Sequence, residues 1–426
     1  MPTILPVKGT RDFFPEEKAF QRWLYEKIRE VSEQFGYQEF DGPFLERLDL
    51  YAAKSGDELV QEQSFVFPDR SGEMIALRPE LTPSLARMLA TRSKSLPRPI
   101  RWWSYGPFWR YERPQKGRSR EFFQWNIDLL GVDSPQADAE IATIAAAFFK
   151  SAGLSPNDVR IKVNNRRLAD AQLQSIGFPL DRRLNIFRLI DRRAKLSPQE
   201  WEEYAKEIGV DPTQLSGLKD LLDDRLAWRT FEELAEFFEA VEMMGAGDYM
   251  EYDPTVVRGL DYYTGTVFEA YDTAGEERAI LGGGRYDNLV ADVGGEPLPG
   301  VGFALGDVVT GLVIEKYGAR PSLRSNPADV FLPTFDQPSL GEALRLASEL
   351  RTAGLRVEWF PEITRLSKQF KYADRQGIPL AAILGPDEIQ ADQVAIKDLR
   401  TGKQVTIPRS EVSALIRELL KEEPKV

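Results

Sequence analysis

Two arginines stand in strand-like settings where their side chains could bind an anion. Arg258 precedes a glycine and the pair Tyr262 and Tyr263, and Arg110 lies in the aromatic segment Phe108–Glu112. A guanidinium stays charged at physiological pH and binds phosphate or carboxylate oxygens through paired hydrogen bonds. The two arginines therefore indicate chemistry on phosphate or carboxylate groups.

Composition limits the groups that can support this chemistry. The chain of 426 residues has no cysteine and no histidine, which excludes thiolate nucleophiles, imidazole bases and metal sites built on either side chain. Carboxylates, arginines, lysines, hydroxyls, amides and bound ions remain. The length predicts about three domains, or two and an insertion.

The net charge of −12 argues against a uniformly basic nucleic-acid binder, although a local patch can still bind one. One basic patch is the segment Arg113–Arg120, and a second has helical spacing and comprises Arg365, Lys368, Lys371 and Arg375. No run approaches the roughly 20 apolar residues that span a bilayer, and the N-terminus lacks a signal-peptide pattern. We expect a cytoplasmic protein with no membrane contact.

Hydrophobic spacing predicts the elements that position the first arginine. We expect a helix over residues 15–35 and an extended segment over 37–44, where Pro43 marks a strand end or edge. Residues 101–130 predict two strands around the basic loop, with one apolar face. The polar face carries Arg110, Glu112, Gln124, Asn126 and Asp128. Such a face is either solvated or binds a charged, polar ligand, and the pattern leaves both open.

The remaining sequence predicts a helical region and a second compact domain. Residues 168–250 are typical of amphipathic helices without evident chemistry, as in an insertion. Strand-like sequence returns at 258–271. The glycines Gly282–Gly284 indicate either a turn or close approach of the backbone to a ligand. The spacing of Gly300–Gly306 predicts a strand that leads into a helix. A linker-like stretch at 317–326 precedes alternating strands and helices, typical of a separate α/β domain.

Five segments together resemble the motifs of histidyl-tRNA synthetases, a family of class II aminoacyl-tRNA synthetases. They are Leu77–Thr82, Arg110–Arg118, Arg258–Tyr263, Gly283–Asp287 and Lys368–Asp374, and the resemblance covers essentially the whole chain. It implies an α+β fold in which an antiparallel class II sheet is flanked by helices, with a helical insertion and a C-terminal α/β anticodon-binding domain. The implied boundaries are 1–165 and 251–318 for the catalytic core, 166–250 for the insertion and 327–426 for the anticodon-binding domain.

The resemblance also implies an activity and its partners. The family joins histidine to ATP, forming histidyl-adenylate, and transfers the histidyl group to the 3′ end of histidine tRNA. It uses magnesium and acts as a homodimer, with Pro43 as the interface proline of the first class II motif. The chemistry needs in-line positioning and electrostatic stabilisation more than a protein base, which suits a chain without histidine.

The same resemblance assigns roles to individual residues. Arg110 and Arg258 become the catalytic pair at the α-phosphate, and Glu112 joins them in binding ATP. The implied histidine-binding residues are Glu80, Thr82, Arg110, Gln124, Asp128, Arg258, Tyr262, Tyr263 and Tyr286. A carboxylate and a phenol suit an imidazole because one accepts its N–H while the other completes the second nitrogen. Gln115 and Arg120 are the implied contacts to the tRNA acceptor end.

Three features depart from the family pattern. Many members carry Glu where this chain has Asp128, and the shorter side chain changes the distance over which the carboxylate can contact a ligand. Simple strand alternation groups Arg258 with Tyr262, whereas the family roles group it with Tyr263. After Gly306 the chain lacks the arginine that usually grips the ATP γ-phosphate. Magnesium, Arg118 or Arg120 are candidates to compensate for it.

Two alternatives to the enzyme are open at this point. One is a non-catalytic histidine-sensing paralogue, the regulatory subunit of ATP phosphoribosyltransferase, which normally lacks the anticodon-binding domain. The other is a synthetase-like module that senses tRNA, although no kinase segment accompanies it.

Overall fold

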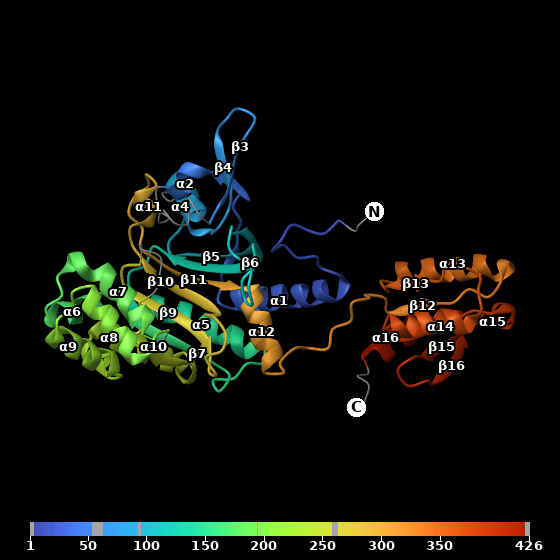
Figure 1. Cartoon of the computed structure of the whole chain (residues 1–426). Coiled ribbons are helices and arrows are strands. Elements are labelled where there is room, and N and C mark those ends of the chain that lie inside the picture. Colours follow the sequence, from blue (N-terminus) through green and yellow to red (C-terminus); the bar gives the residue numbers. More distant parts are fainter. Residues whose placement is uncertain (1–3, 53–62, 93–94, 194, 258–262, 422–426) are drawn as a thin grey trace. The chain divides into compact units, whose positions relative to one another are not determined.

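The computed structural model describes residues 4–52, 63–92, 95–193, 195–257 and 263–421 (Figure 1). By its contacts the chain forms two compact units, one of Met1–Asp12 with Leu24–Arg320 and one of Phe13–Trp23 with Pro321–Val426. No helix among the described residues is both long and apolar enough to cross a membrane.

An eight-stranded sheet organises the larger unit. Its order is β1-β5-β6-β11-β10-β9-β7-β8, and neighbours are antiparallel except for the terminal pairs β1–β5 and β7–β8. In that order the strands span Gln38–Glu39, Ile100–Trp109, Glu121–Leu130, Gly300–Gly306, Leu281–Tyr286, Thr266–Asp272, Val159–Asn165 and Met250–Tyr252. This antiparallel sheet with flanking helices confirms the predicted fold class.

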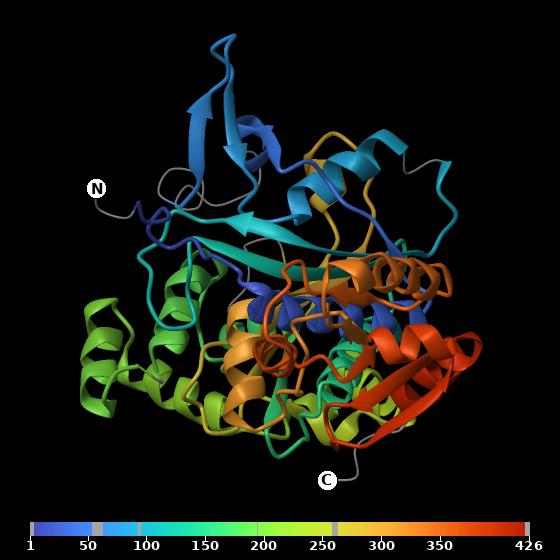
Figure 2. The ribbon, with the colours of Figure 1, turned by 90° about the vertical axis from the view of Figure 1, so that its right-hand side faces the viewer.

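The β5–β6 hairpin has one apolar face, as its alternating sequence predicts. Trp103 and Trp125 are fully buried on that face. Helix α5 (Pro135–Ser151) packs there, with the Phe148 ring 5.4 Å from that of Trp125. Helix α1 (Pro15–Gln34), predicted over residues 15–35, places the Tyr25 ring 6.0 Å from that of Trp103. Figure 2 shows α1, in dark blue, along the same side of the sheet.

A three-stranded sheet carries the loop that faces the polar side of the hairpin. Its order is β2-β4-β3, with strands Leu45–Arg47, Met74–Leu77 and Phe65–Pro68, and it stands out from the sheet in Figures 1 and 2. Residues 78–82 follow β4, and α4 (Thr82–Arg92) begins at the end of this loop. The short helices α2 (Leu48–Ala52) and α11 (Leu289–Asp292) pack against α4.

Arg78 is a charged side chain with no exposed surface, and it fixes this loop. Its Nη1 donates to Asp41 at 2.5 Å and to the Gly42 carbonyl at 3.0 Å, and its Nε donates to the Pro107 carbonyl at 2.9 Å. Its guanidinium lies between two rings, 4.6 Å from the centroid of Phe44 and 4.5 Å from that of Phe108. One residue thus joins the 41–44 segment, the loop after β4 and the end of β5.

The predicted helical region is present, and most of it forms a core of its own. Helices α6 (Arg166–Ser175), α7 (Arg183–Arg192), α8 (Pro198–Glu207) and α9 (Pro212–Asp223) share a cluster that includes Trp201, Ile186 and Leu218. Helix α10 (Glu232–Met243) packs instead along α5, where Gln136 Nε2 donates to Glu236 at 3.1 Å.

The smaller unit contains the predicted alternation of strands and helices. Its sheet has the order β13-β12-β14-β15-β16, with strands Val357–Trp359, Val330–Leu332, Leu380–Ile383, Gln393–Asp398 and Gln404–Pro408. Its helices are α13 (Gln337–Thr352), α14 (Leu366–Arg375), α15 (Pro386–Ala391) and α16 (Val412–Lys421).

Two local expectations need correction. Within the extended segment 37–44, only Gln38–Glu39 form a strand. The Arg78 side chain donates to the Gly42 carbonyl and the Arg78 backbone N–H donates to the Phe44 carbonyl, so these carbonyls do not extend the strand. The glycine run 282–284 lies inside strand β10 and is no turn. By contrast, β11 leads directly into α12 (Asp307–Lys316), as the spacing of Gly300–Gly306 predicts.

Substitution of Arg78 should destabilise the protein far more than loss of a surface ion pair. Arg78→Ala removes three hydrogen bonds and two ring contacts from a fully buried site, so we expect a loss of about 3 kcal/mol in the free energy of unfolding. Arg29→Ala is the control, because Arg29 pairs with Glu26 and Glu33 on the exposed face of α1 and its loss should leave the free energy of unfolding nearly unchanged. Urea unfolding of both variants measures the difference, and equal losses would contradict the role of Arg78.

Candidate active site

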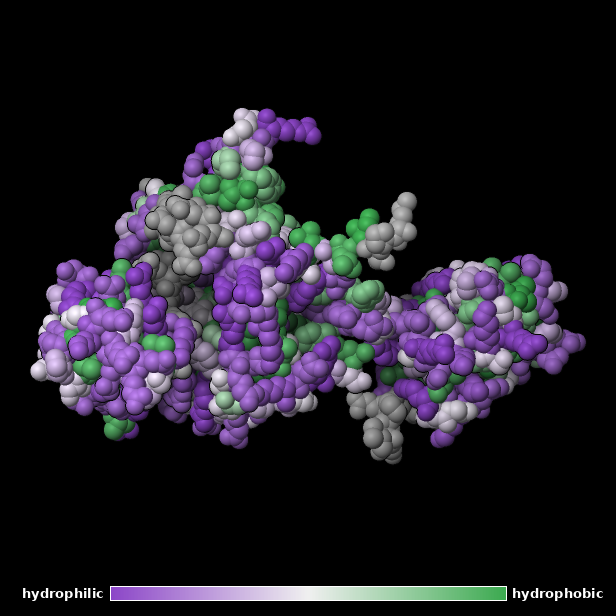
Figure 3. Space-filling model, in the orientation of Figure 1, coloured by the Kyte–Doolittle hydropathy of each residue, from purple (hydrophilic) through white to green (hydrophobic). Residues whose placement is uncertain are grey.

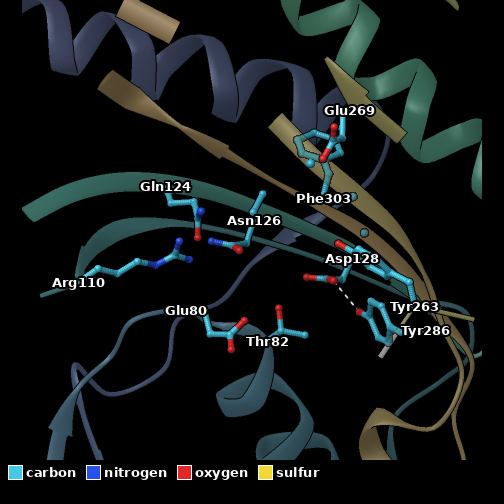
Figure 4. A pocket seen from close by; sticks show the side chains of 14 residues that line it. Glu80, Thr82, Arg110, Gln124, Asn126, Asp128, Tyr263, Glu269, Tyr286 and Phe303 are labelled. Carbon is cyan, nitrogen blue, oxygen red and sulfur yellow. Dashed lines mark hydrogen bonds between the residues drawn. The ribbon is translucent and has the colours of Figure 1, made fainter. Parts of the chain in front are cut away.

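A cavity of about 260 Å³ opens on the polar face of the hairpin, between β6 and the loop after β4. Figure 4 shows Glu80 and Thr82 on one wall, facing Gln124, Asn126 and Asp128 on the other. The described residues that line it are Glu80, Thr82, Arg110, Gln124, Asn126, Asp128, Tyr263, Glu269, Gly282, Gly283, Tyr286, Gly302, Phe303 and Ala304. The polar strand face that the sequence left open is therefore the wall of a cavity.

The cavity brings together seven of the nine residues predicted to bind histidine. Glu80 and Thr82 come from the loop after β4, and Gln124 and Asp128 come from β6. Arg110, Tyr263 and Tyr286 complete the set. Arg258 and Tyr262 lie outside the described residues, so their predicted positions stay predictions, as does the pairing of Arg258 with either tyrosine.

Asp128 is the buried acid of the cavity. The Tyr286 hydroxyl donates to its Oδ1 at 2.6 Å, the contact drawn as a dashed line in Figure 4. Burial raises the pKa of Asp128 to about 7, and the hydrogen bond from Tyr286 opposes this shift. Asp128 is thus poised between its neutral and charged forms, and a ligand that donates to the carboxylate would favour the charged one.

Glycines make room for this acid. A β-carbon on Gly302 would overlap the Asp128 carboxylate, and one on Gly283 would lie 2.5 Å from the Gly302 carbonyl oxygen. A β-carbon on Gly282 would meet nothing within 4 Å, and Gly282 lines the cavity. Gly283 and Gly302 therefore permit close strand packing, while Gly282 keeps the cavity open.

Arg110 stands at the junction of two cavities. Its Nε donates to the Pro79 carbonyl at 3.0 Å, and its guanidinium lies 5.3 Å from the centroid of Phe122. The same side chain lines a second cavity of about 520 Å³. Backbone and ring contacts thus orient a guanidinium that both cavities share.

The second cavity holds Glu112, which the family resemblance assigns to ATP binding. Glu112 is buried there and forms an ion pair with Arg118. The described lining residues are Arg110, Glu112, Gly117, Arg118, Ser119, Phe122, Lys195, Tyr271, Glu277, Arg278, Ala279, Gly306, Val308 and Val309. Basic side chains outnumber acidic ones by four to two, in a chain whose net charge is −12. This cavity therefore suits an anionic ligand.

Asp307 explains part of the departure after Gly306. Its Oδ2 accepts from Arg11 at 2.8 Å and its Oδ1 accepts from the Phe123 N–H at 2.8 Å, so both oxygens face inward. Burial raises the pKa of Asp307, and the Arg11 guanidinium opposes the shift. In place of a phosphate-binding arginine, this turn contains an acid that joins α12 to the N-terminal segment and to β6.

Sequence reasoning gave no role to Asn126, Glu269 or Phe303, which also line the first cavity. Asn126 was placed on the polar face without a role, yet it is 5% exposed and its Nδ2 has no hydrogen-bond partner among the described residues. Glu269 and Phe303 come from β9 and β11, and no sequence signal marked either as lining a cavity. The parity of Asn126 with Gln124 and Asp128 was a signal that could have identified it.

The two residues predicted to contact tRNA lie on the β5–β6 loop, and neither is among the residues that line the two cavities. Gln115 is exposed at a turn closed by paired backbone hydrogen bonds with Arg118. The Arg120 guanidinium lies 4.2 Å from the Tyr111 ring centroid, and its Nε donates to the Glu112 carbonyl at 3.0 Å. Their contact with tRNA stays a prediction.

Comparison with known proteins decides the family. The family model described as "Histidyl-tRNA synthetase" matches residues 9–307, and "Anticodon binding domain" matches residues 330–419. The chain belongs to the histidyl-tRNA synthetase family. This confirms the resemblance seen in the motifs, and the second match identifies the smaller unit as an anticodon-binding domain.

Relatives of this family match along nearly the whole chain. A histidine–tRNA ligase of Opitutus terrae is 37% identical over 98% of this chain and 99% of its own length. A chloroplastic and mitochondrial histidine–tRNA ligase of Arabidopsis thaliana is 36% identical over 96% of this chain and 86% of its own length. The crystal structure of histidyl-tRNA synthetase from Nostoc superposes with a TM-score of 0.84 at 27% identity, covering 98% of this chain and all of that one.

The titration of Asp128 predicts a pH-dependent stability for the unliganded protein. In the folded protein the pKa of Asp128 is raised to about 7. The contribution of this group to the free energy of unfolding is therefore full below the pKa that Asp128 has in the unfolded chain, and it is lost as the pH rises through about 7. Asp128→Asn removes this titration, so the variant should gain on the order of 1–2 kcal/mol relative to the parent between pH 5.5 and pH 7.5. Thermal or urea unfolding at both pH values measures the difference, and a difference independent of pH would contradict the buried, titrating acid.

Proposed function

We propose that this chain is a histidine–tRNA ligase that forms histidyl-adenylate from histidine and ATP and then esterifies the 3′ end of histidine tRNA. One observation carries the proposal: the cavity around Asp128 and Tyr286 and the basic cavity around Glu112 meet at Arg110. An amino-acid site and a nucleotide site must share a boundary where carboxylate and α-phosphate react. Membership of the family supports the same assignment.

Histidine fits the first cavity by the chemistry of its walls. Asp128 would accept an imidazole N–H, with Tyr263 at the other side of the ring and Tyr262 and Tyr286 lining the pocket. The α-ammonium would donate hydrogen bonds to Glu80 and Thr82, which lie across from β6, and to Gln124 on β6 itself. This orientation leaves the α-carboxylate toward Arg110.

Adenylate formation needs no protein base in this arrangement. The histidine carboxylate is already ionised at neutral pH, so its oxygen can attack the α-phosphorus directly while the bond to pyrophosphate breaks. Arg110, with Arg258 opposite, would stabilise the charge that develops on the α-phosphate. ATP enters with magnesium as its counterion, because Mg²⁺ favours phosphate oxygens and water over all-protein cages. The tRNA ribose hydroxyl then attacks the histidyl carbonyl and AMP leaves.

Transfer RNA would be bound at two places. Gln115 and Arg120 are our candidates at the acceptor end. Four exposed basic residues lie along α14 in the smaller unit, which suits contact with an RNA backbone: Arg365, Lys368, Lys371 and Arg375. We propose that residues 1–165 and 251–318 form the catalytic core, residues 166–250 the insertion and residues 327–426 the anticodon-binding domain. We also propose that the enzyme acts in the cytoplasm.

The histidine-sensing paralogue has less support than the enzyme. A histidine-sensing paralogue does not require an anticodon-binding domain, whereas this chain has one at residues 330–419. A solved protein titled as a regulatory subunit or histidyl-tRNA synthetase from Bacillus halodurans shares the fold at 24% identity, with a TM-score of 0.74. That likeness concerns the fold alone.

Charging of histidine tRNA by the purified protein with ATP and magnesium tests the function directly. Arg258→Ala should reduce histidine-dependent pyrophosphate exchange by about 100- to 1000-fold, because the α-phosphate loses one of two positive partners. Histidine binding, measured by calorimetry, should change little. Wild-type exchange in this variant would contradict the role of Arg258, and histidine binding without any adenylate in the parent would favour the sensing paralogue.

We also propose a homodimer that buries the apolar surface around the small sheet. Figure 3 shows green, apolar surface gathered over the base of the β3–β4 hairpin. Large apolar side chains are 40–52% exposed in this region, namely Phe44, Leu45, Phe67, Met74 and Tyr111. Pro43 is exposed beside them. Contiguous exposed apolar surface of this kind marks an interaction site.

A charge within this surface should weaken the dimer. Phe67→Glu places a carboxylate on a residue 40% exposed in the monomer, so it should shift sedimentation toward the monomer without unfolding the chain. Val405→Glu is the matched control, since Val405 is 45% exposed in the smaller unit. A parent that sediments as a monomer at all concentrations would contradict the proposal.

A further inference from the structure

The second cavity contains a basic side chain to which neither the sequence pattern nor the family resemblance gave a role. Arg278 follows β9 and lines this cavity. It makes no hydrogen bond or ion pair with any residue that the structure describes. An arginine on a cavity wall without a carboxylate partner has its donors available for a ligand.

The other charged groups of this cavity are already paired. Glu112 pairs with Arg118, and Glu277 pairs with Lys116 from outside the cavity lining. Lys195 donates to Asp191 at 2.7 Å. Arg110 is fixed at Pro79, on the boundary with the histidine cavity. Arg278 is therefore the side chain most ready to neutralise additional negative charge in this cavity.

Arg278 also lies beside the N-terminal turn of α12, where the chain has valines. A β-carbon placed on Gly117 would lie 3.5 Å from Val309 Cγ2 and 3.7 Å from Arg278 Cδ. Both side chains thus reach the same point over the β5–β6 loop. Val308 and Val309 line the cavity as apolar residues, so α12 contributes no cationic side chain to it.

From this geometry we infer that Arg278 binds the terminal phosphates of ATP in the second cavity, in the space that a cation on α12 would otherwise reach. The inference rests on the proposed function, because it takes the ligand to be ATP with its α-phosphate at Arg110. The negative charge of ATP is concentrated on the β- and γ-phosphates. Arg278 is a positioning and binding residue for these groups and takes no part in the bond changes at the α-phosphorus.

Arg278→Ala should weaken ATP far more than AMP. We expect the ATP KM in histidine-dependent pyrophosphate exchange to rise on the order of 10- to 100-fold, with the histidine KM changed less than about threefold. Binding of AMP, and of a non-hydrolysable histidyl-adenylate analogue, should be unchanged because neither carries β- and γ-phosphates. Arg278→Lys should retain part of the ATP affinity. Arg188→Ala, an exposed arginine on α7 away from both cavities, is the control.

A second variant tests the shared location. In the Arg278→Ala background, Val309→Arg places a guanidinium on α12 beside the same point and should recover ATP affinity. No recovery would show that the two positions do not serve the same phosphates. An unchanged ATP KM in Arg278→Ala, or an equal loss of ATP and AMP binding, would overturn the inference itself.

The result is separable from the proposed function. Calorimetric binding of ATP and AMP reports on Arg278 even when no pyrophosphate exchange occurs. A protein that binds ATP and AMP without catalysing pyrophosphate exchange would contradict the proposed ligase function. Its affinities for ATP and AMP would still test the role of Arg278. Normal exchange with an unaffected ATP:AMP affinity ratio would contradict the arginine alone.

Discussion

The burial of one guanidinium, that of Arg78, constrains most of the candidate active site. A charge without exposed surface is costly unless it is paired, and here Asp41, Gly42 and Pro107 accept from Nη1 and Nε, while Nη2 has no hydrogen-bond partner among the described residues. Those partners belong to segments far apart in the chain, so satisfying Arg78 requires them to meet. The meeting places the Pro79 carbonyl where it accepts from Arg110, and it places Glu80 and Thr82 across from β6. Arg78 thus positions residues of the candidate site while its own side chain lines neither cavity.

Buried carboxylates play different parts depending on their partners. Asp307 faces a guanidinium and a backbone N–H, and it joins α12 to β6 and to the N-terminal segment. Among the described residues, Asp128 accepts a side-chain hydrogen bond from the phenol of Tyr286, and burial raises the pKa of Asp128 to about 7. The first acid is structural because its charge is satisfied within the protein. Asp128 suits ligand recognition because a hydrogen-bond donor on a bound ligand would stabilise its charge.

The sequence predicted the elements better than it predicted their surroundings. The alternation along β5 and β6 correctly placed Gln124, Asn126 and Asp128 on one face, and the spacing in α1 gave its bounds within one residue. Local periodicity could not show that this face is covered by the 78–82 loop, because the covering depends on the long-range contacts of Arg78. For the same reason Glu269, Phe303 and Arg278 could not be foreseen as cavity walls. The glycines of β10 were ambiguous because their function is set by Asp128 and Gly302 on neighbouring strands.

The single guanidinium of Arg110 on the boundary of both cavities has a thermodynamic consequence. Its Nε is committed to Pro79, so its orientation is set before either ligand arrives. An amino acid and a nucleotide that both contact it alter the electrostatic potential that the other experiences. Linkage then requires that each changes the affinity of the other by the same factor. In the proposed function the two substrates would therefore be energetically coupled through this one side chain.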